Sequence, residues 1–134
     1  MITDETMEII NKTVEKTVSE TVLKMKMAKL LNDSEKSAYS KTEELLRNYP
    51  TFKQIIDQPY TIKLCEKIEK ALNDLGNEPY REIIDLFYFQ NQTRETIALE
   101  LGCTVRTVGR NKARLVNELK VKLFSDDVIR ELFL

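Results

Sequence analysis

Residues 93–119 read TRETIALELGCTVRTVGRNKARLVNEL, and this stretch decides the expected fold. Thr93 and Thr104 stand where helices can begin, because a threonine hydroxyl accepts a hydrogen bond from the backbone N–H groups of a first helical turn. Gly102 follows an apolar run and suits the left-handed conformation that ends many helices. The sequence therefore predicts two helices joined by a turn of three or four residues, which is the helix-turn-helix arrangement.

The apolar and the basic residues of this stretch fall on different faces of the expected helices. The positions that hold the two helices at a fixed angle are Ile97, Ala98, Leu101, Val108 and Leu115. The remaining surface of the second helix carries Arg106, Thr107, Arg110, Lys112 and Arg114. Residues 92–124 hold seven Lys or Arg and three Glu, whereas the whole chain has a net charge of -1. Positive charge gathered on one helix is the pattern expected of phosphate contact.

The composition of the 134 residues favours one all-α domain with an appended element. Only three Gly and three Pro are present, which is too few for an all-β fold with frequent turns. Leu, Glu, Lys and Ile are plentiful, as is typical of helical proteins.

Several classes of function are not expected. The chain has no His, the commonest general base, and no Gly-rich phosphate loop, so we expect neither an enzyme nor a catalytic residue. Cys65 and Cys103 are isolated, so we expect no metal site and no other cofactor. Neither a signal peptide nor an apolar run of about 18 residues is present, which favours a cytoplasmic protein without a membrane span.

Residues 1–33 are expected to form a long helical arm. Its apolar stripe has a mean spacing of 3.75 residues and consists of Ile10, Val14, Val18, Val22 and Met25. A helix of this kind needs a partner to bury its stripe. We expect self-association through this arm, most simply as a dimer, with packing against the chain's own domain as the alternative.

Residues 34–60 are expected to form short connecting helices. Ser40 and Glu43 fit a capping box, in which Ser40 caps the helix and Glu43 reaches back to it. Pro50 is expected to end the first of these helices, because the residue before a proline avoids the helical conformation.

Residues 61–124 are expected to form the main helical domain. Pro59 suits the first turn of its opening helix, and Gly76 or Asn77 permits the left-handed residue that can end that helix. The aromatic residues 87–89 are expected in the core rather than in a platform for stacked bases, because no basic residue interleaves them. Residues 125–134 are expected to form a short helical tail.

The segment LCEKIEKALNDLGNEPYREIIDLFYFQNQTRETIALELGCTVRTVGRNKARLVNEL, residues 64–119, resembles region 4 of bacterial sigma factors. A bend at residues 72–80 and an aromatic stretch precede the helix that begins at Thr93, as in that family. The matching spaced positions are Ile97, Ala98, Leu101, Gly102, Thr104, Thr107 and Val108. The resemblance implies a DNA-binding transcription regulator. The chain has no Trp and no counterpart of the aromatic helix that melts DNA, which disfavours a complete sigma factor.

The upstream segment AYSKTEELLRNYPTFKQII, residues 38–56, is similar to phage-encoded regulators of the ArpU and RinA type. This similarity implies a phage or prophage protein that acts on late genes, and it leaves contact with RNA polymerase open. Two departures stand out. Asn111 and Lys112 occupy positions where at least one apolar residue is expected. Gly109 is either a tolerated change or a means to bring the helix backbone close to DNA, and we favour the second.

The expected partner is double-stranded DNA, read by the second helix of the pair. Arg106 and Arg110 lie one turn apart near the start of that helix, where they can pair with guanine edges in the major groove. Val105 could contact a thymine methyl group or be buried. Contacts with phosphates set the register of a protein on DNA. The residues expected to make these contacts are Thr104, Thr107, Lys112, Arg114 and, from the preceding helix, Arg94.

Two alternatives remain open at this stage. A small DNA-packaging subunit of a phage terminase also combines a helix-turn-helix with an oligomerising helical part, and it would form a ring of many subunits. A protein-binding adaptor would use the same fold to grip a polymerase subunit or a sigma factor, and it would show no salt-sensitive binding to DNA.

Overall fold

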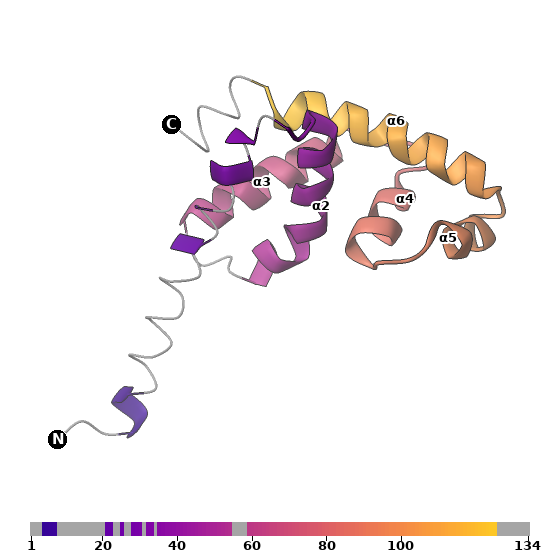
Figure 1. Ribbon diagram of the computed structural model, residues 1–134. Helices are drawn as coiled ribbons and strands as arrows, with labels where there is room; N and C mark the ends of the chain where they lie inside the picture. Colours follow the sequence, from indigo (N-terminus) through magenta and orange to yellow (C-terminus); the bar gives the residue numbers. More distant parts are fainter. Residues whose placement is uncertain are drawn as a thin grey trace.

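The computed structural model describes residues 4–7, 21–22, 25, 28–30, 32–33, 35–54 and 59–125, and within them all regular structure is helical (Figure 1). The elements are α2 (Ala38–Gln54), α3 (Pro59–Asn73), α4 (Glu82–Ile84), the π-helical turn η1 (Asp85–Phe89), α5 (Arg94–Leu101) and α6 (Val105–Leu123). The expected all-α fold class is confirmed.

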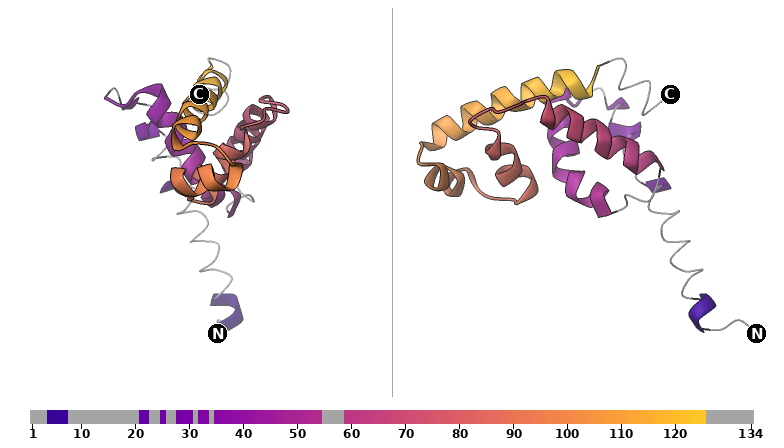
Figure 2. Two further views of the ribbon diagram at one scale, coloured as in Figure 1. Left: turned by 90° about the vertical axis from the view of Figure 1, so that its right-hand side faces the viewer. Right: turned by 180° about the vertical axis from the view of Figure 1, so that it is seen from behind.

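The long helix α6 joins the two halves of the molecule. Helices α2 and α3 pack against each other and against the end of α6 that lies toward the C-terminus. Helices α4 and α5 and the turn η1 lie along the other half of α6 (Figures 1 and 2). The first half of α6 is therefore held by the segment around α5, and its second half by the upstream helices.

Two clusters of buried apolar side chains match this division. The larger cluster lies between α2, α3 and the second half of α6, and its fully buried members include Leu46, Phe52, Leu64, Ile68, Leu115 and Leu119. The smaller cluster consists of Ile83, Leu86, Ile97, Ala98 and Val108. Tyr80 and Phe87 are half-buried and pack against both clusters.

Helix α2 differs from the expected pair of short connecting helices. It continues through Pro50 to Gln54, so the prediction that Pro50 ends the helix is wrong. A proline inside a helix costs about 3 kcal/mol, but full burial of one large apolar side chain returns about 1.5–3 kcal/mol. Tyr49 and Phe52 flank the proline and are both buried in the larger cluster. Helix α2 is thus part of the core and not a connector.

The start of α2 also differs from the expected capping box. Ser37 Oγ, and not Ser40 Oγ, accepts the capping hydrogen bond, and the donor is the backbone N–H of Ser40 at 3.1 Å. Glu43 does not reach back to the helix start, because its carboxylate bonds to Tyr88 and Lys112 instead. The local cap has moved to Ser37, and tertiary contacts with η1 and α6 engage the carboxylate of Glu43 instead.

Little of the expected N-terminal arm is described. Ile10, Val14 and Val18, like residues 126–134 of the expected tail, lie outside the described residues. Val22 and Met25 are helical and exposed, at 43% and 67%. Leu30 is buried in the larger cluster, so the C-terminal end of the arm belongs to the core. No helix within the described part of the chain is long and apolar enough to cross a bilayer.

Candidate nucleic-acid interface

Helices α5 and α6 are joined by a tight turn with the expected caps. Thr93 Oγ1 accepts a hydrogen bond from the Thr96 N–H at 3.2 Å, and Thr104 Oγ1 accepts one from the Thr107 N–H at 3.1 Å. Gly102 ends α5 with φ 68°, in the left-handed region that a residue without Cβ enters at low cost. The predicted helix caps at Thr93 and Thr104 and the predicted left-handed conformation of Gly102 are confirmed.

The smaller cluster fixes the angle between α5 and α6. Ile97 and Val108 are fully buried, one from each helix, and Ala98 is 5% exposed. Side chains packed at this density have few alternative arrangements, so the two helices hold one relative orientation. Leu101 and Cys103 are half-buried against the same cluster, as expected for Leu101.

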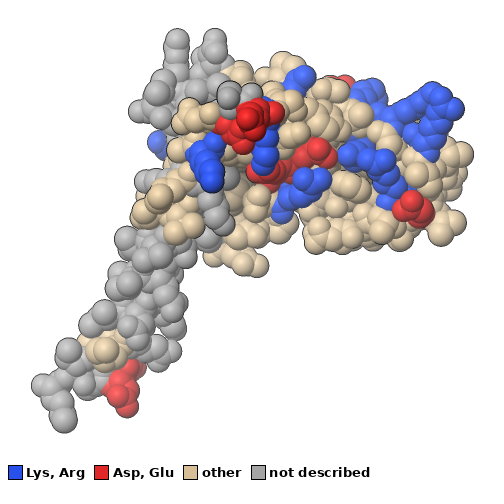
Figure 3. Space-filling view, viewed as in Figure 1, with Lys and Arg blue, Asp and Glu red and all other residues tan. Residues whose placement is uncertain are grey.

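The side of α6 that faces away from both clusters is basic. Arg106 and Arg110 are exposed on it, one helical turn apart, and the next exposed positions are Arg114 and Asn117. The first carboxylate along this side is that of Glu118. Figure 3 shows Lys and Arg side chains gathered over the end of the molecule where α5 and α6 meet. An exposed cationic surface on a rigid helix pair is therefore present at the expected place.

Arg94 reaches from the start of α5 toward α6. Its Nη1 atom lies 4.0 Å from the point that a Cβ would occupy on Gly109. Arg94 is exposed, so its guanidinium group can join those of Arg106 and Arg110 on one surface. The structure thus places the guanidinium group of Arg94 beside α6.

The two predicted threonines take part mainly in capping. Thr104 is exposed and Thr107 is half-buried, and their hydroxyl oxygens are 2.9 Å apart. Both side chains lie at the N-terminal end of α6, where the unpaired backbone N–H groups favour an anion. A phosphate contact by Thr104 is compatible with this arrangement.

Lys112 is not on the exposed face, so its prediction as a phosphate contact is wrong. The residue is 6% exposed, and its Nζ atom lies 3.2 Å from Glu43 Oε2 and 4.8 Å from the centre of the Phe87 ring. The cause is helical periodicity, because Lys112 follows Val108 by four residues and precedes Leu115 by three, and both of those are buried. The expectation of an apolar residue at 111 or 112 was the sequence signal for this burial.

The sequence did not predict that Glu43 and Tyr88 contact α6. Tyr88 Oη donates to Glu43 Oε2 at 2.6 Å, and Arg47 Nη2 lies 3.5 Å from the same oxygen. Burial raises the pKa of Glu43, but the hydrogen bond from Tyr88 and the charges of Lys112 and Arg47 lower it further than burial raises it. Glu43 is therefore an ionised carboxylate that binds three neighbouring side chains, those of Tyr88, Lys112 and Arg47.

The guanidinium group of Arg114 is already engaged by carboxylates, which leaves less of it available to a ligand. Its Nη2 atom lies 2.5 Å from Glu78 Oε1, and Glu118 Oε1 lies 3.6 Å from its Nη1. The hydrogen bond from Arg114 lowers the pKa of Glu78, which is fully ionised at neutral pH. These carboxylates offset the charge of Arg114 at the surface, which sequence analysis did not anticipate.

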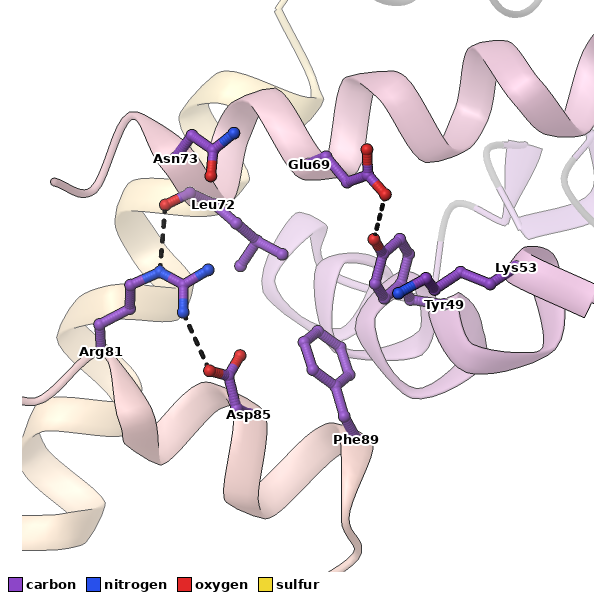
Figure 4. A pocket seen from close by; sticks show the side chains of 8 residues that line it. All are labelled: Tyr49, Lys53, Glu69, Leu72, Asn73, Arg81, Asp85 and Phe89. Atoms are coloured by element: carbon purple, nitrogen blue, oxygen red, sulfur yellow. Dashed lines mark hydrogen bonds and ion pairs between the residues drawn. The ribbon is translucent and has the colours of Figure 1, made fainter. Parts of the chain in front are cut away.

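A cavity of about 340 Å³ opens elsewhere, between α2, α3 and the α4–η1 segment (Figure 4). Its polar groups bond to one another: Arg81 Nη1 to Asp85 Oδ2 at 2.9 Å, Arg81 Nε to the Leu72 carbonyl at 3.3 Å, and Tyr49 Oη to Glu69 Oε1 at 2.5 Å. These bonds tie three elements together across the cavity. No group of three His, Cys, Asp or Glu in the described residues is placed to hold a metal ion.

No protein-family model, curated protein or solved structure matches the chain. A function for this chain must therefore be inferred from its own residues and their geometry.

Proposed function

We propose that this protein is a sequence-specific DNA-binding transcription regulator that reads double-stranded DNA with the first half of α6. The observation that carries the proposal is the pair of exposed arginines, Arg106 and Arg110, on a helix whose opposite face is locked in two apolar clusters. A helix of about 10–12 Å diameter fits the major groove, which is about 12 Å wide. Each arginine can donate two hydrogen bonds to the N7 and O6 acceptors of a guanine.

Three further groups suit contacts with the DNA backbone. Arg94 lies beside Gly109, at the edge of the face of α6 that carries Arg106 and Arg110. Thr104 is exposed at the N-terminus of α6. Arg114 adds a weaker contact, because Glu78 and Glu118 compete with a phosphate for its guanidinium group. Contacts of this kind set the register of a protein on DNA, whereas base contacts set its sequence preference.

The resemblance to sigma region 4 and to phage late regulators supports a role in transcription, with late phage or prophage genes as targets. The arm supports a dimer, because Val22 and Met25 are exposed apolar side chains on its helical residues. Two linked readers bind more tightly than one, because the second contact is made at high effective concentration. RNA polymerase is the further partner that the resemblance implies.

The test is selection of bound sequences from random duplex DNA, followed by affinity measurements at several salt concentrations. We expect enrichment of a short motif that contains guanines and an affinity that falls as salt rises. A protein that enriches no motif and binds duplex DNA with no salt dependence would refute the proposal.

A protein-binding adaptor is the second candidate, favoured by one observation. Leu99 is 85% exposed on α5, and exposed Glu95 and Glu100 lie beside it. Carboxylates repel phosphates, so this surface suits a protein and not DNA. Specific capture of a polymerase subunit or sigma factor, lost in Leu99→Asp, together with no affinity for DNA, would favour the adaptor.

A further inference from the structure

Lys112 lies at the junction between the two apolar clusters. Along α6, Val108 belongs to the smaller cluster and Leu115 to the larger one, and Lys112 stands between them. Of the buried residues that the structure describes, Lys112 is the one with a charged side chain. The point on α6 where the two clusters meet is thus occupied by a charged side chain, whose polar contacts are directional.

Three elements converge on one oxygen atom at this junction. Glu43 Oε2, from α2, accepts hydrogen bonds from Tyr88 Oη of η1 at 2.6 Å and from Lys112 Nζ of α6 at 3.2 Å. The ammonium group of Lys112 also lies over the rings of Phe87 and Tyr88, at 4.8 and 5.8 Å from their centres. The hydrogen bond therefore constrains the direction in which the Lys112 side chain points, and the two rings constrain how deeply its ammonium group lies.

Stability alone does not account for this ion pair. The cost of removing two charges from water often exceeds their attraction, and apolar residues of similar size frequently replace buried ion pairs without loss of stability. A buried polar contact instead selects one geometry, because any other arrangement leaves a charge without a partner. At this site the selected geometry is the rotation of α6 about its axis.

Small rotations of α6 matter for base reading. Side chains end about 5–6 Å from a helix axis, so a rotation of about 20° displaces them by roughly 2 Å. Hydrogen-bond distances tolerate only a few tenths of an ångström. The bidentate contacts of Arg106 and Arg110 with guanine would not survive such a displacement.

We infer that Glu43 is a positioning residue for DNA reading: through Lys112 and Tyr88 it fixes the rotation of α6, and so sets the base preference of Arg106 and Arg110 without touching DNA. The inference rests on the proposed DNA-binding function. It assigns α2 a part in sequence specificity as well as in the core.

The test compares base discrimination with stability and salt dependence. The double variant Glu43→Gln with Lys112→Met removes both charges and leaves no buried ion without a partner. Tyr88→Phe is a milder change that deletes only the hydroxyl group on Glu43. Glu44→Gln is the matched control, since Glu44 is the neighbouring residue and pairs with Lys36 at the surface.

We expect the double variant to melt near the parent temperature and to keep the parent's salt slope. Its discrimination between the selected site and a site with one changed base pair should fall to less than ~3-fold, against the ~5–150-fold that one base-pair mismatch ordinarily costs. Tyr88→Phe should lose part of this discrimination, and Glu44→Gln should lose none.

Two results would overturn the inference. One is parental discrimination in both the double variant and Tyr88→Phe, which would leave the cluster a purely structural role. The other is a salt slope lowered by about 1 in the double variant, which would mean that Lys112 contacts a phosphate. A parent protein that discriminates no sequence would instead refute the DNA-reading function itself, and the inference with it.

Discussion

The two glycines of the α5–α6 segment should respond in opposite ways to alanine. Gly102 has φ 68°, and no atom lies within 4 Å of its would-be Cβ. The cost of Gly102→Ala is therefore purely that of the left-handed backbone, about 1–2 kcal/mol. Gly109 lies inside α6, and the nearest atom to its would-be Cβ is Arg94 Nη1 at 4.0 Å, an ordinary contact. Gly109→Ala should gain the helix propensity of alanine, about 1 kcal/mol.

Thermal melts of the parent and both variants test this prediction. For a chain of 134 residues, a change of 1 kcal/mol corresponds to about 4 °C. Gly109→Ala should melt higher than the parent by about that amount, and Gly102→Ala should melt lower by at least as much. If Gly109→Ala melted at or below the parent temperature with unchanged helix content, the reasoning that a methyl group fits beside Arg94 without strain would be refuted.

The stabilised variant also separates the two interpretations of Gly109. If this glycine brings the backbone of α6 close to DNA, Gly109→Ala should bind the selected site at least about fivefold more weakly, although it is more stable. Equal affinity for the selected site would show that the glycine is a tolerated change.

Three further predictions concern charge and assembly. Arg106→Ala or Arg110→Ala should cost ~1–3 kcal/mol on the selected site and relax preference at one or two base pairs; equal binding of every sequence by both variants and the parent would refute their role. Glu78→Gln should free Arg114, so that all duplexes bind more tightly and the salt slope rises by about 1, whereas Glu78→Gln in an Arg114→Ala background should change neither quantity. Deletion of residues 1–27, which spares the buried Leu30, should leave a folded monomer in light scattering, and a full-length protein that is itself monomeric at tens of micromolar would refute the dimer.

The local features of the candidate site were predictable from the sequence. The caps at Thr93 and Thr104 and the left-handed Gly102 depend on atoms within five residues of one another, so short-range rules suffice to find them. The apolar positions of α5 and α6 follow helical periodicity in the same way, which is why Ile97, Val108 and their neighbours were correctly assigned to the core.

Contacts between distant parts of the chain decided the rest. Pro50 stays inside α2 because the aromatic side chains on either side of it are buried in the larger cluster, where Tyr49 meets Glu69 of α3 and Phe89 of η1, and no local rule includes those elements. Helical periodicity places Lys112 on the inward face of α6, but its charge can be buried there because a carboxylate 69 residues earlier, that of Glu43, meets its ammonium group. The sequence alone determined that a basic helix follows a tight turn, since turns and caps are local. That one of its cations could be buried was decided only by tertiary structure, because a buried charge needs a partner that the fold must bring to it.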